Sequence, residues 1–227
     1  MAVRSRILRR GAVAITLILG VLVGTSAWQG SQADSARAER CARNQADSEQ
    51  RARLDAGTGR RIAVIGDSYS VGLGLDDLAD SWPSRLPGRV HVEGFSGSGF
   101  SQGASACGRV WYAARAGRAL ASKPDVVVVE GGLNDFDQPS AAIAAGADDV
   151  LRRLNGVTVV VVGPAPAPSR AGEVARVDAV LAGAAQRHGA TYVSAAAWDL
   201  EYLDDRLHLT LAGHREFGDL VAASLPR

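Results

Sequence analysis

Short apolar runs alternate with amphipathic stretches along the chain from residue 61 onward. The runs are continuous and rich in β-branched residues, a pattern that indicates strands buried on both faces. Glycine or proline follows most of them, which marks where each strand ends. The predicted strands are Ile62–Ile65, Val90–Val92, Asp125–Glu130, Val157–Val162 and Thr191–Val193.

Helical patterns fill most of the intervals between these runs. Strands that alternate with helices predict a parallel sheet with helices on both faces. We therefore expect a flavodoxin-like, three-layer α/β/α domain with a five-stranded parallel sheet over residues 61–227. In such folds the chemistry lies at the carboxyl ends of the strands. The predicted helices are Ser81–Leu86, Gln102–Ser122, Ser140–Leu154, Gly172–His188 and Ala212–Ser224.

The first 27 residues differ from the rest. Four arginines between positions 4 and 10 precede an uncharged run whose apolar part is Gly11–Gly24. A membrane-spanning helix needs about 20 apolar residues, so this short run favours a secretory signal, with cleavage after Ala27 or Ala33. The alternative is an uncleaved membrane anchor, because the run to Trp28 is just long enough to span. Either way, the rest of the chain is predicted to lie outside the cytoplasm.

Residues 28–60 are polar and are predicted to form a linker or a helical arm. Cys41 lies in this arm and Cys107 in the main domain. Outside the cytoplasm an even cysteine count favours a disulfide that ties the two together, and two unpaired buried thiols are the alternative. Two isolated cysteines lack the ligand spacing of a metal site, so none is expected.

Composition narrows the function further. A chain of 227 residues with 47% hydrophobic and 22% charged residues is neither wholly disordered nor a polytopic membrane protein. The formal net charge is +1, and cleavage after Ala27 removes four arginines and no acid. A basic surface for nucleic acid is therefore not expected.

Polar residues with acyl-transfer chemistry follow the predicted strands. Ser68 comes after the first strand, Gly97 after the second and Asn134 after the third, while Asp205 and His208 precede the last helix. Each alone has a plain structural interpretation as a turn or surface residue. Together, and in this order, they supply a nucleophile, a base, an acid and oxyanion donors.

Each of these groups has a physical role in serine catalysis. Ser68 is a poor nucleophile until His208 takes its proton, and Asp205, three residues earlier, orients the imidazole and stabilises its charged form. The oxyanion is expected to receive hydrogen bonds from the N–H groups of Ser68 and Gly97 and from the side-chain amide of Asn134. His214, in the last predicted helix, is expected to pack or to cap.

With these residues in place, the sequence resembles the SGNH or GDSL hydrolases over about residues 61–225. The resemblance implies a three-layer fold, esterase, lipase or thioesterase activity, and no cofactor or metal. Tyr69 departs from the family, which usually has Leu or Ile there. Gly99 is an alternative to Gly97 in the second block. The matching blocks are Gly66-Asp67-Ser68, Ser96-Gly97-Ser98, Gly132-Leu133-Asn134-Asp135 and Asp205-Arg206-Leu207-His208.

The resulting hypothesis is a secreted or membrane-tethered, monomeric serine esterase. It would act on small-molecule or polymer-linked esters with short acyl or acetyl groups. A lipase or acyltransferase of the same family is one alternative, and a non-catalytic envelope binding protein is another. A nucleotide-binding module is disfavoured because the chain lacks a phosphate-binding glycine motif. The loop Pro164–Pro168 is either a plain connector or part of the substrate groove.

Overall fold

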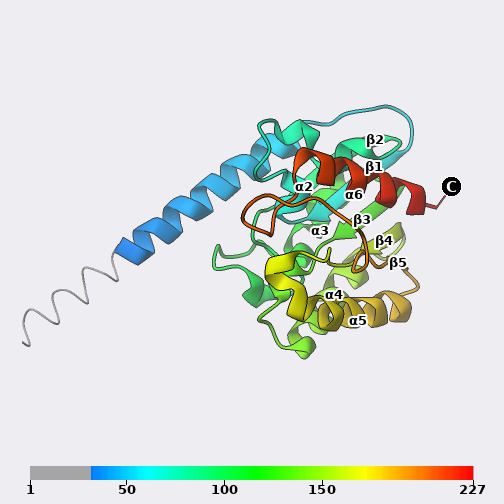
Figure 1. Ribbon diagram of the computed structural model, residues 1–227. Coiled ribbons are helices and arrows are strands. Elements are labelled where there is room, and N and C mark those ends of the chain that lie inside the picture. Colours follow the sequence, from blue (N-terminus) through cyan, green and yellow to red (C-terminus); the bar gives the residue numbers. More distant parts are fainter. Residues whose placement is uncertain (1–31, 227) are drawn as a thin grey trace, which may run out of the picture. The chain divides into compact units, whose positions relative to one another are not determined.

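The computed structural model describes residues 32–226 (Figure 1). By its contacts the chain divides into two units, Met1–Ala42 and Arg43–Arg227. In the first unit residues 32–42 are helical, and in the second the helical segment at its start ends at residue 52. The predicted signal or anchor, residues 1–27, lies outside the described residues. Within residues 32–226, no helix is both long and apolar enough to cross a membrane.

Five parallel strands form one sheet in the order β2-β1-β3-β4-β5, which is the flavodoxin-like order. This confirms the predicted fold class. The register pairs Gly66 of β1 with Gly94 of β2, so these two strands end side by side. The strands are β1 (Arg61–Gly66), β2 (Arg89–Gly94), β3 (Val126–Glu130), β4 (Thr158–Val162) and β5 (Thr191–Val193).

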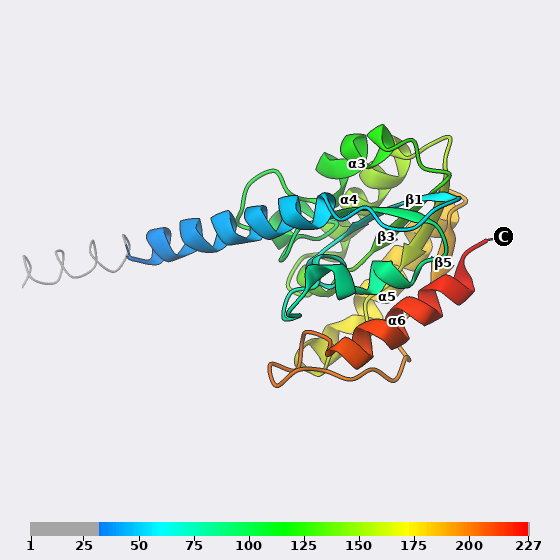
Figure 2. The ribbon, with the colours of Figure 1, turned by 90° about the horizontal axis from the view of Figure 1, so that it is seen from above.

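Side chains that alternate along each strand fill two separate cores. Ile62 and Val64 of β1 face a core shared with Phe217, whereas Ala63 and Ile65 face the other core. Helices α3 and α6 therefore lie on opposite sides of the strands (Figure 2), with α4 and α5 on the side of α3. The helices are α3 (Tyr112–Ala121), α4 (Ser140–Arg153), α5 (Ala171–Arg187) and α6 (Leu211–Ser224).

Two local expectations are corrected. The predicted helix Gln102–Ser122 is instead a short 3-10 turn, Gln102–Ala104, a loop, and then α3 from Tyr112. Gly108 in that loop has φ +80°, a left-handed conformation that interrupts a helix. The predicted helix Ser81–Leu86 is a 3-10 turn, η2 (Trp82–Arg85), with proline at its start.

Both cysteines are disulfide-bonded, as predicted, and neither is free. Residues 43–60 contact the carboxyl end of β2 through polar side chains. Asn44 Nδ2 donates to the carbonyl of Ser96 at 2.9 Å, and Ser48 Oγ donates to the carbonyl of Gly94 at 2.5 Å. Residues 43–60 therefore stabilise the carboxyl end of β2, which leads into the loop that contains Gly97.

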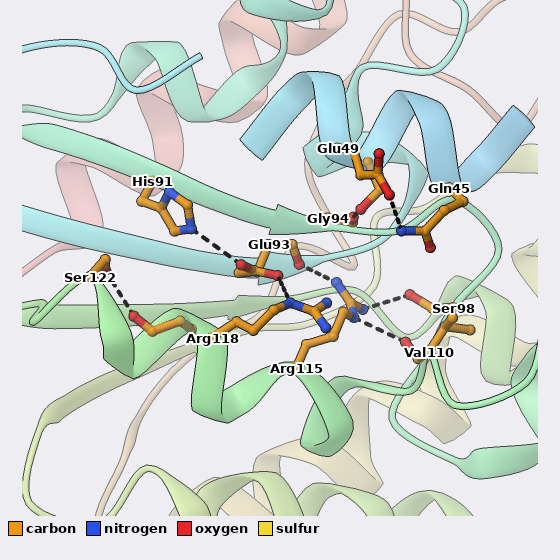
Figure 3. Close-up of polar contacts among 12 residues, drawn as sticks. Gln45, Glu49, His91, Glu93, Gly94, Ser98, Val110, Arg115, Arg118 and Ser122 are labelled. Carbon is orange, nitrogen blue, oxygen red and sulfur yellow. Dashed lines mark hydrogen bonds and ion pairs between the residues drawn. The ribbon is translucent and has the colours of Figure 1, made fainter. Parts of the chain in front are cut away.

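Farther down β2, His91 lies between two carboxylates. Its Nδ1 is 2.8 Å from Asp55 Oδ1 and its Nε2 is 3.2 Å from Glu93 Oε1. Figure 3 shows Glu93 between His91 and Arg118, whose Nε is 2.8 Å from Glu93 Oε2. The hydrogen bond to Glu93, against the effect of partial burial and with help from Asp55, raises the pKa of His91. Although burial acts in the opposite sense, hydrogen bonds from His91 and Arg118 lower the pKa of Glu93.

This cluster predicts a pH-dependent contribution to stability. The usual pKa of histidine is about 6.5, and that of His91 is raised in the folded state. Protonated His91 therefore stabilises the folded state fully below about pH 6.5, and this stabilisation disappears as the pH rises through the folded-state pKa. Glu93 stays ionised above about pH 5, because its pKa is below its usual range. The free energy of unfolding should therefore differ between the parent and His91→Gln by about 1 kcal/mol at pH 5.5, and by less at pH 9. Urea unfolding at the two pH values measures this, and an equal difference at both would contradict it.

Candidate active site

The strand-to-helix turn after β1 places Ser68. The four-residue helix α2 (Ser68–Val71) begins directly after Asp67, whose Oδ1 accepts a hydrogen bond from the N–H of Tyr69 at 3.0 Å. An acid at this position satisfies a backbone donor that the helix itself leaves unpaired. Ser68 is thus the first residue of α2, at the carboxyl edge of the sheet, with 7% of its surface exposed.

A tight hairpin before α6 carries the other two residues of the predicted trio. The N–H of Leu203 donates to the carbonyl of His208 at 2.8 Å and closes the hairpin. Asp205 Oδ1 accepts from the N–H groups of Leu207 and His208, each at 2.9 Å. Asp205 Oδ2 lies 2.6 Å from His208 Nδ1. Slight burial would raise the pKa of Asp205, but these hydrogen bonds outweigh it and hold the pKa below its usual value.

The hairpin and α2 bring Ser68, His208 and Asp205 into one hydrogen-bonded chain. His208 Nε2 is 3.2 Å from Ser68 Oγ, on the opposite side of the ring from Asp205. The Asp205 side chain is about half exposed (48%), whereas the His208 ring is mostly buried (16%). The contact to Asp205 places the proton on Nδ1, which leaves Nε2 free to accept one from Ser68.

The glycine loop after β2 lies beside this chain. Gly97 has φ +78°, and a side chain built on it would meet nothing within 4 Å. A side chain on Gly99 would instead lie 2.4 Å from Asp135 Oδ2, and the carbonyl of Gly99 accepts from the N–H of Tyr112. Gly97 therefore borders open space, whereas Gly99 packs inward.

The third predicted oxyanion donor is already hydrogen-bonded. Asn134 lies in the 3-10 turn η4 (Leu133–Asp135). Its Nδ2 donates to Asp67 Oδ2 at 3.1 Å and to the carbonyl of Ser98 at 2.9 Å. Because an amide carries only two such hydrogens, both are engaged in this structure.

Comparisons with known proteins identify the family of the chain. The model of the GDSL-like Lipase/Acylhydrolase family matches residues 64–216, which include all five predicted site residues. The chain belongs to this family. It is accordingly a carboxylic ester hydrolase. A comparison with curated proteins finds no match.

Solved structures share the family fold. A carbohydrate acetylesterase from Sinorhizobium meliloti is 21% identical, with a TM-score of 0.59 over 73% of this chain and 98% of that one. The aryl esterase of M. smegmatis is 20% identical, with a TM-score of 0.56 over 73% and 98%. A lipolytic protein of the G-D-S-L family from Desulfitobacterium hafniense is 18% identical, with a TM-score of 0.60 over 74% and 100%.

Two buried acids lie beneath the site of this GDSL-family chain. Asp67 connects the nucleophile turn to Asn134, and burial raises its pKa to about 6, against the opposing effects of the Tyr69 N–H and His208. Glu130, at the end of β3, accepts from Ser70 Oγ at 2.7 Å, and burial raises its pKa well above the usual value. From the sequence alone, neither Asp67 nor Glu130 has a predicted role in the site. The signal for Glu130 was an acid that closes a run of four valines.

Arg115 of α3 was also missed, although it joins several parts of the site. Its guanidinium is buried (1% exposed) and donates to the carbonyls of Gly66 at 3.0 Å and of Glu93. It also donates to Ser98 Oγ at 2.7 Å and to the carbonyl of Val110 at 3.0 Å. Figure 3 shows Arg115 reaching from α3 toward Ser98 and Val110. Burial lowers its pKa to about 10, so it remains charged at neutral pH.

Two other expectations concern residues outside the catalytic chain. His214 is buried in α6, and its Nδ1 accepts from the N–H of Trp82 at 3.3 Å, so it packs as predicted. Burial lowers the pKa of His214 to about 4, which keeps the ring neutral. Across residues 32–226, no group of three or more His, Cys, Asp or Glu side chains is placed to hold a metal ion.

The several hydrogen bonds of the buried Arg115 guanidinium predict a large loss of stability when this side chain is replaced. Arg115→Met removes a donor from the carbonyls of Gly66, Glu93 and Val110 and from Ser98 Oγ, so the free energy of unfolding should fall by at least about 3 kcal/mol. Arg118→Met, on the same helix, removes a mostly exposed guanidinium and should cost less than Arg115→Met, because its partner Glu93 keeps the hydrogen bond to His91. Urea unfolding compares the two variants, and equal losses would show that Arg115 is not the anchor.

Proposed function

We propose that this family member is an extracytoplasmic serine esterase that hydrolyses short-acyl or acetyl esters through an acyl-enzyme on Ser68. The observation that carries the proposal is the continuous chain of hydrogen bonds from Ser68 Oγ through His208 to Asp205, at 3.2 and 2.6 Å. This is the arrangement that serine acyl transfer requires: a nucleophile, a base aimed at it, and an acid that orients the base.

The reaction proceeds in two balanced steps. Ser68 Oγ attacks the ester carbonyl carbon while its proton passes to His208 Nε2, and collapse of the tetrahedral intermediate expels the alcohol, which takes that proton. Water then attacks the acyl group on Ser68, again giving its proton to His208 Nε2. The proton returns to Ser68 Oγ as the carboxylic acid departs. Asp205 stays ionised and stabilises the charged imidazolium in both steps.

The proposed oxyanion donors are the N–H groups of Ser68 and Gly97 and the amide of Asn134. Gly97 borders open space, which leaves room for the substrate carbonyl. Asn134 would give up one of its two present acceptors to the oxyanion. Its bond to Asp67 is the longer one, at 3.1 Å against 2.9 Å to Ser98, and is therefore the one we expect to be exchanged.

A short acyl group is supported by the similar structures. They include a carbohydrate acetylesterase and an aryl esterase, which favours a small acyl group on a small-molecule or polymer-linked ester. The loop Pro164–Pro168 follows β4 at the carboxyl edge of the sheet, the edge that also carries Ser68, and this placement is compatible with a role in the substrate groove.

The location and assembly state are likewise proposals. The disulfide and the charged, then apolar, N-terminal sequence support secretion or a tether on the outer side of the membrane. Among residues 32–226, Leu211 is the one exposed large hydrophobic side chain. In this part of the chain the exposed surface has no cluster of large apolar side chains, which supports a monomer.

The central test is hydrolysis of p-nitrophenyl acetate, butyrate and palmitate by the parent and by Ser68→Ala. We expect the parent to prefer acetate or butyrate and Ser68→Ala to lose at least about a thousandfold in kcat, because the nucleophile is gone. Ser84→Ala, an exposed serine in η2, serves as the control and should match the parent.

Other results of this assay point elsewhere. A preference for palmitate would indicate a lipase. Equal and poor hydrolysis by the parent and Ser68→Ala would rule out simple esters as substrates. Acetylated polysaccharide would then test for polymer hydrolysis and added acyl acceptors would test for acyl transfer, and no reaction with either would indicate a binding protein.

Asp205 offers a second test with a matched neighbour. Asp205→Asn removes the charge that stabilises the imidazolium and should lower kcat by about a hundred- to ten-thousandfold. Asp204→Asn changes the same group one position earlier, on an exposed residue, and should leave kcat within about twofold. Steady-state kinetics on the preferred p-nitrophenyl ester compares them, and similar losses in both variants would remove Asp205 from the mechanism.

A further inference from the structure

Tyr69, the residue directly after Ser68, reaches the hairpin that carries His208. Its hydroxyl donates a hydrogen bond to the main-chain carbonyl of Leu207 at 2.5 Å. That carbonyl belongs to the same peptide group as the N–H of His208, which donates to Asp205 Oδ1 at 2.9 Å. Because a peptide group is planar, its orientation is fixed from both ends, by Tyr69 at the oxygen and by Asp205 at the nitrogen.

The ring of Tyr69 cannot easily move away from this contact. It is 2% exposed and packs edge-on against His214 and Phe217, with ring centroids 6.2 and 6.0 Å away. The centroid of the His208 ring is 6.5 Å from that of the Tyr69 ring. Burial, together with the nearby Tyr202 and Asp67, raises the pKa of Tyr69 far above its usual value. The hydroxyl therefore keeps its proton, and remains a donor, at any pH near neutral.

We propose that Tyr69 is a positioning residue that holds His208 at the distance at which it accepts the proton of Ser68. This inference rests on the proposed serine-esterase function. Helix α2 carries both the nucleophile, Ser68, and the side chain that positions the base, Tyr69. One helical turn therefore sets the 3.2 Å separation between Ser68 Oγ and His208 Nε2.

The test compares two tyrosine variants that each lose one hydroxyl. Tyr69→Phe keeps the packed ring and removes the hydroxyl that donates to Leu207 and interacts with Tyr202. Tyr192→Phe is the matched control. Tyr192 lies in β5, and its hydroxyl donates to Asp178 Oδ1 of α5 at 2.7 Å and not to the hairpin that carries His208. We expect kcat of Tyr69→Phe to fall about tenfold with KM nearly unchanged, because the substrate site is intact and only the alignment of the base is lost. Tyr192→Phe should keep the kcat of the parent.

A second readout does not depend on turnover. The proton between His208 Nδ1 and Asp205 gives a downfield ¹H NMR resonance, assigned by its loss in Asp205→Asn. It should broaden or shift upfield in Tyr69→Phe and stay in place in Tyr192→Phe. The inference is overturned if Tyr69→Phe retains the parent's kcat and resonance, or if both tyrosine variants lose kcat equally. If Ser68→Ala still hydrolyses esters, the proposed function fails, and the resonance alone decides the role of Tyr69.

Discussion

The buried guanidinium of Arg115 holds together three pieces of backbone that the catalytic centre needs in fixed positions. It donates to the carbonyls of Gly66, the last residue of β1, and of Glu93, the next-to-last residue of β2, and to Ser98 Oγ in the glycine loop. Parallel strands present their carboxyl ends at one edge, but the loops that leave this edge need further bonds to stay in place. A charged group is costly to bury, so its removal from water is offset only because its donors find several oxygen atoms at once. The nucleophile turn and the oxyanion loop thus depend on one side chain from α3.

The buried acids near the site are compensated less completely than the guanidinium of Arg115. Asp67 and Glu130 are buried, and burial raises the pKa of each. Asp67 nevertheless accepts hydrogen bonds from the N–H of Tyr69 and from Asn134, so the same carboxylate starts α2 and orients the proposed oxyanion donor. A neutral residue at position 67 would avoid the desolvation cost but would leave Asn134 less well held. The site therefore accepts a cost in stability for the orientation of one amide, which is common at functional sites.

Local patterns in the sequence predict the sheet well, and they also point to the three residues that the structure joins in one hydrogen-bonded chain. Valine-rich runs and the residues that follow them are properties of short segments. The contacts that hold the trio are different in kind. Asp67 and Asn134 are 67 positions apart, and Tyr69 and Leu207 are 138 apart, so no periodicity connects them. Arg115 in an amphipathic helix is most simply interpreted as a surface residue, and only the fold shows that it points inward. The over-long helix prediction at Gln102–Ser122 failed for a related reason, since the left-handed Gly108 lies in a stretch otherwise rich in helix formers.

The hairpin that carries Asp205 and His208 shows how a half-exposed acid can still be held accurately. Arg206 at its tip has φ +57°, a left-handed conformation that costs about 1–2 kcal/mol in a residue other than glycine. Backbone hydrogen bonds offset this cost: the N–H of Arg206 donates to Leu203, and the carbonyl of Arg206 accepts from Ser169. The carboxylate of Asp205 accepts two more from its own turn. Because backbone bonds fix the hairpin, Asp205 can face solvent, where it remains ionised, without losing its alignment with His208.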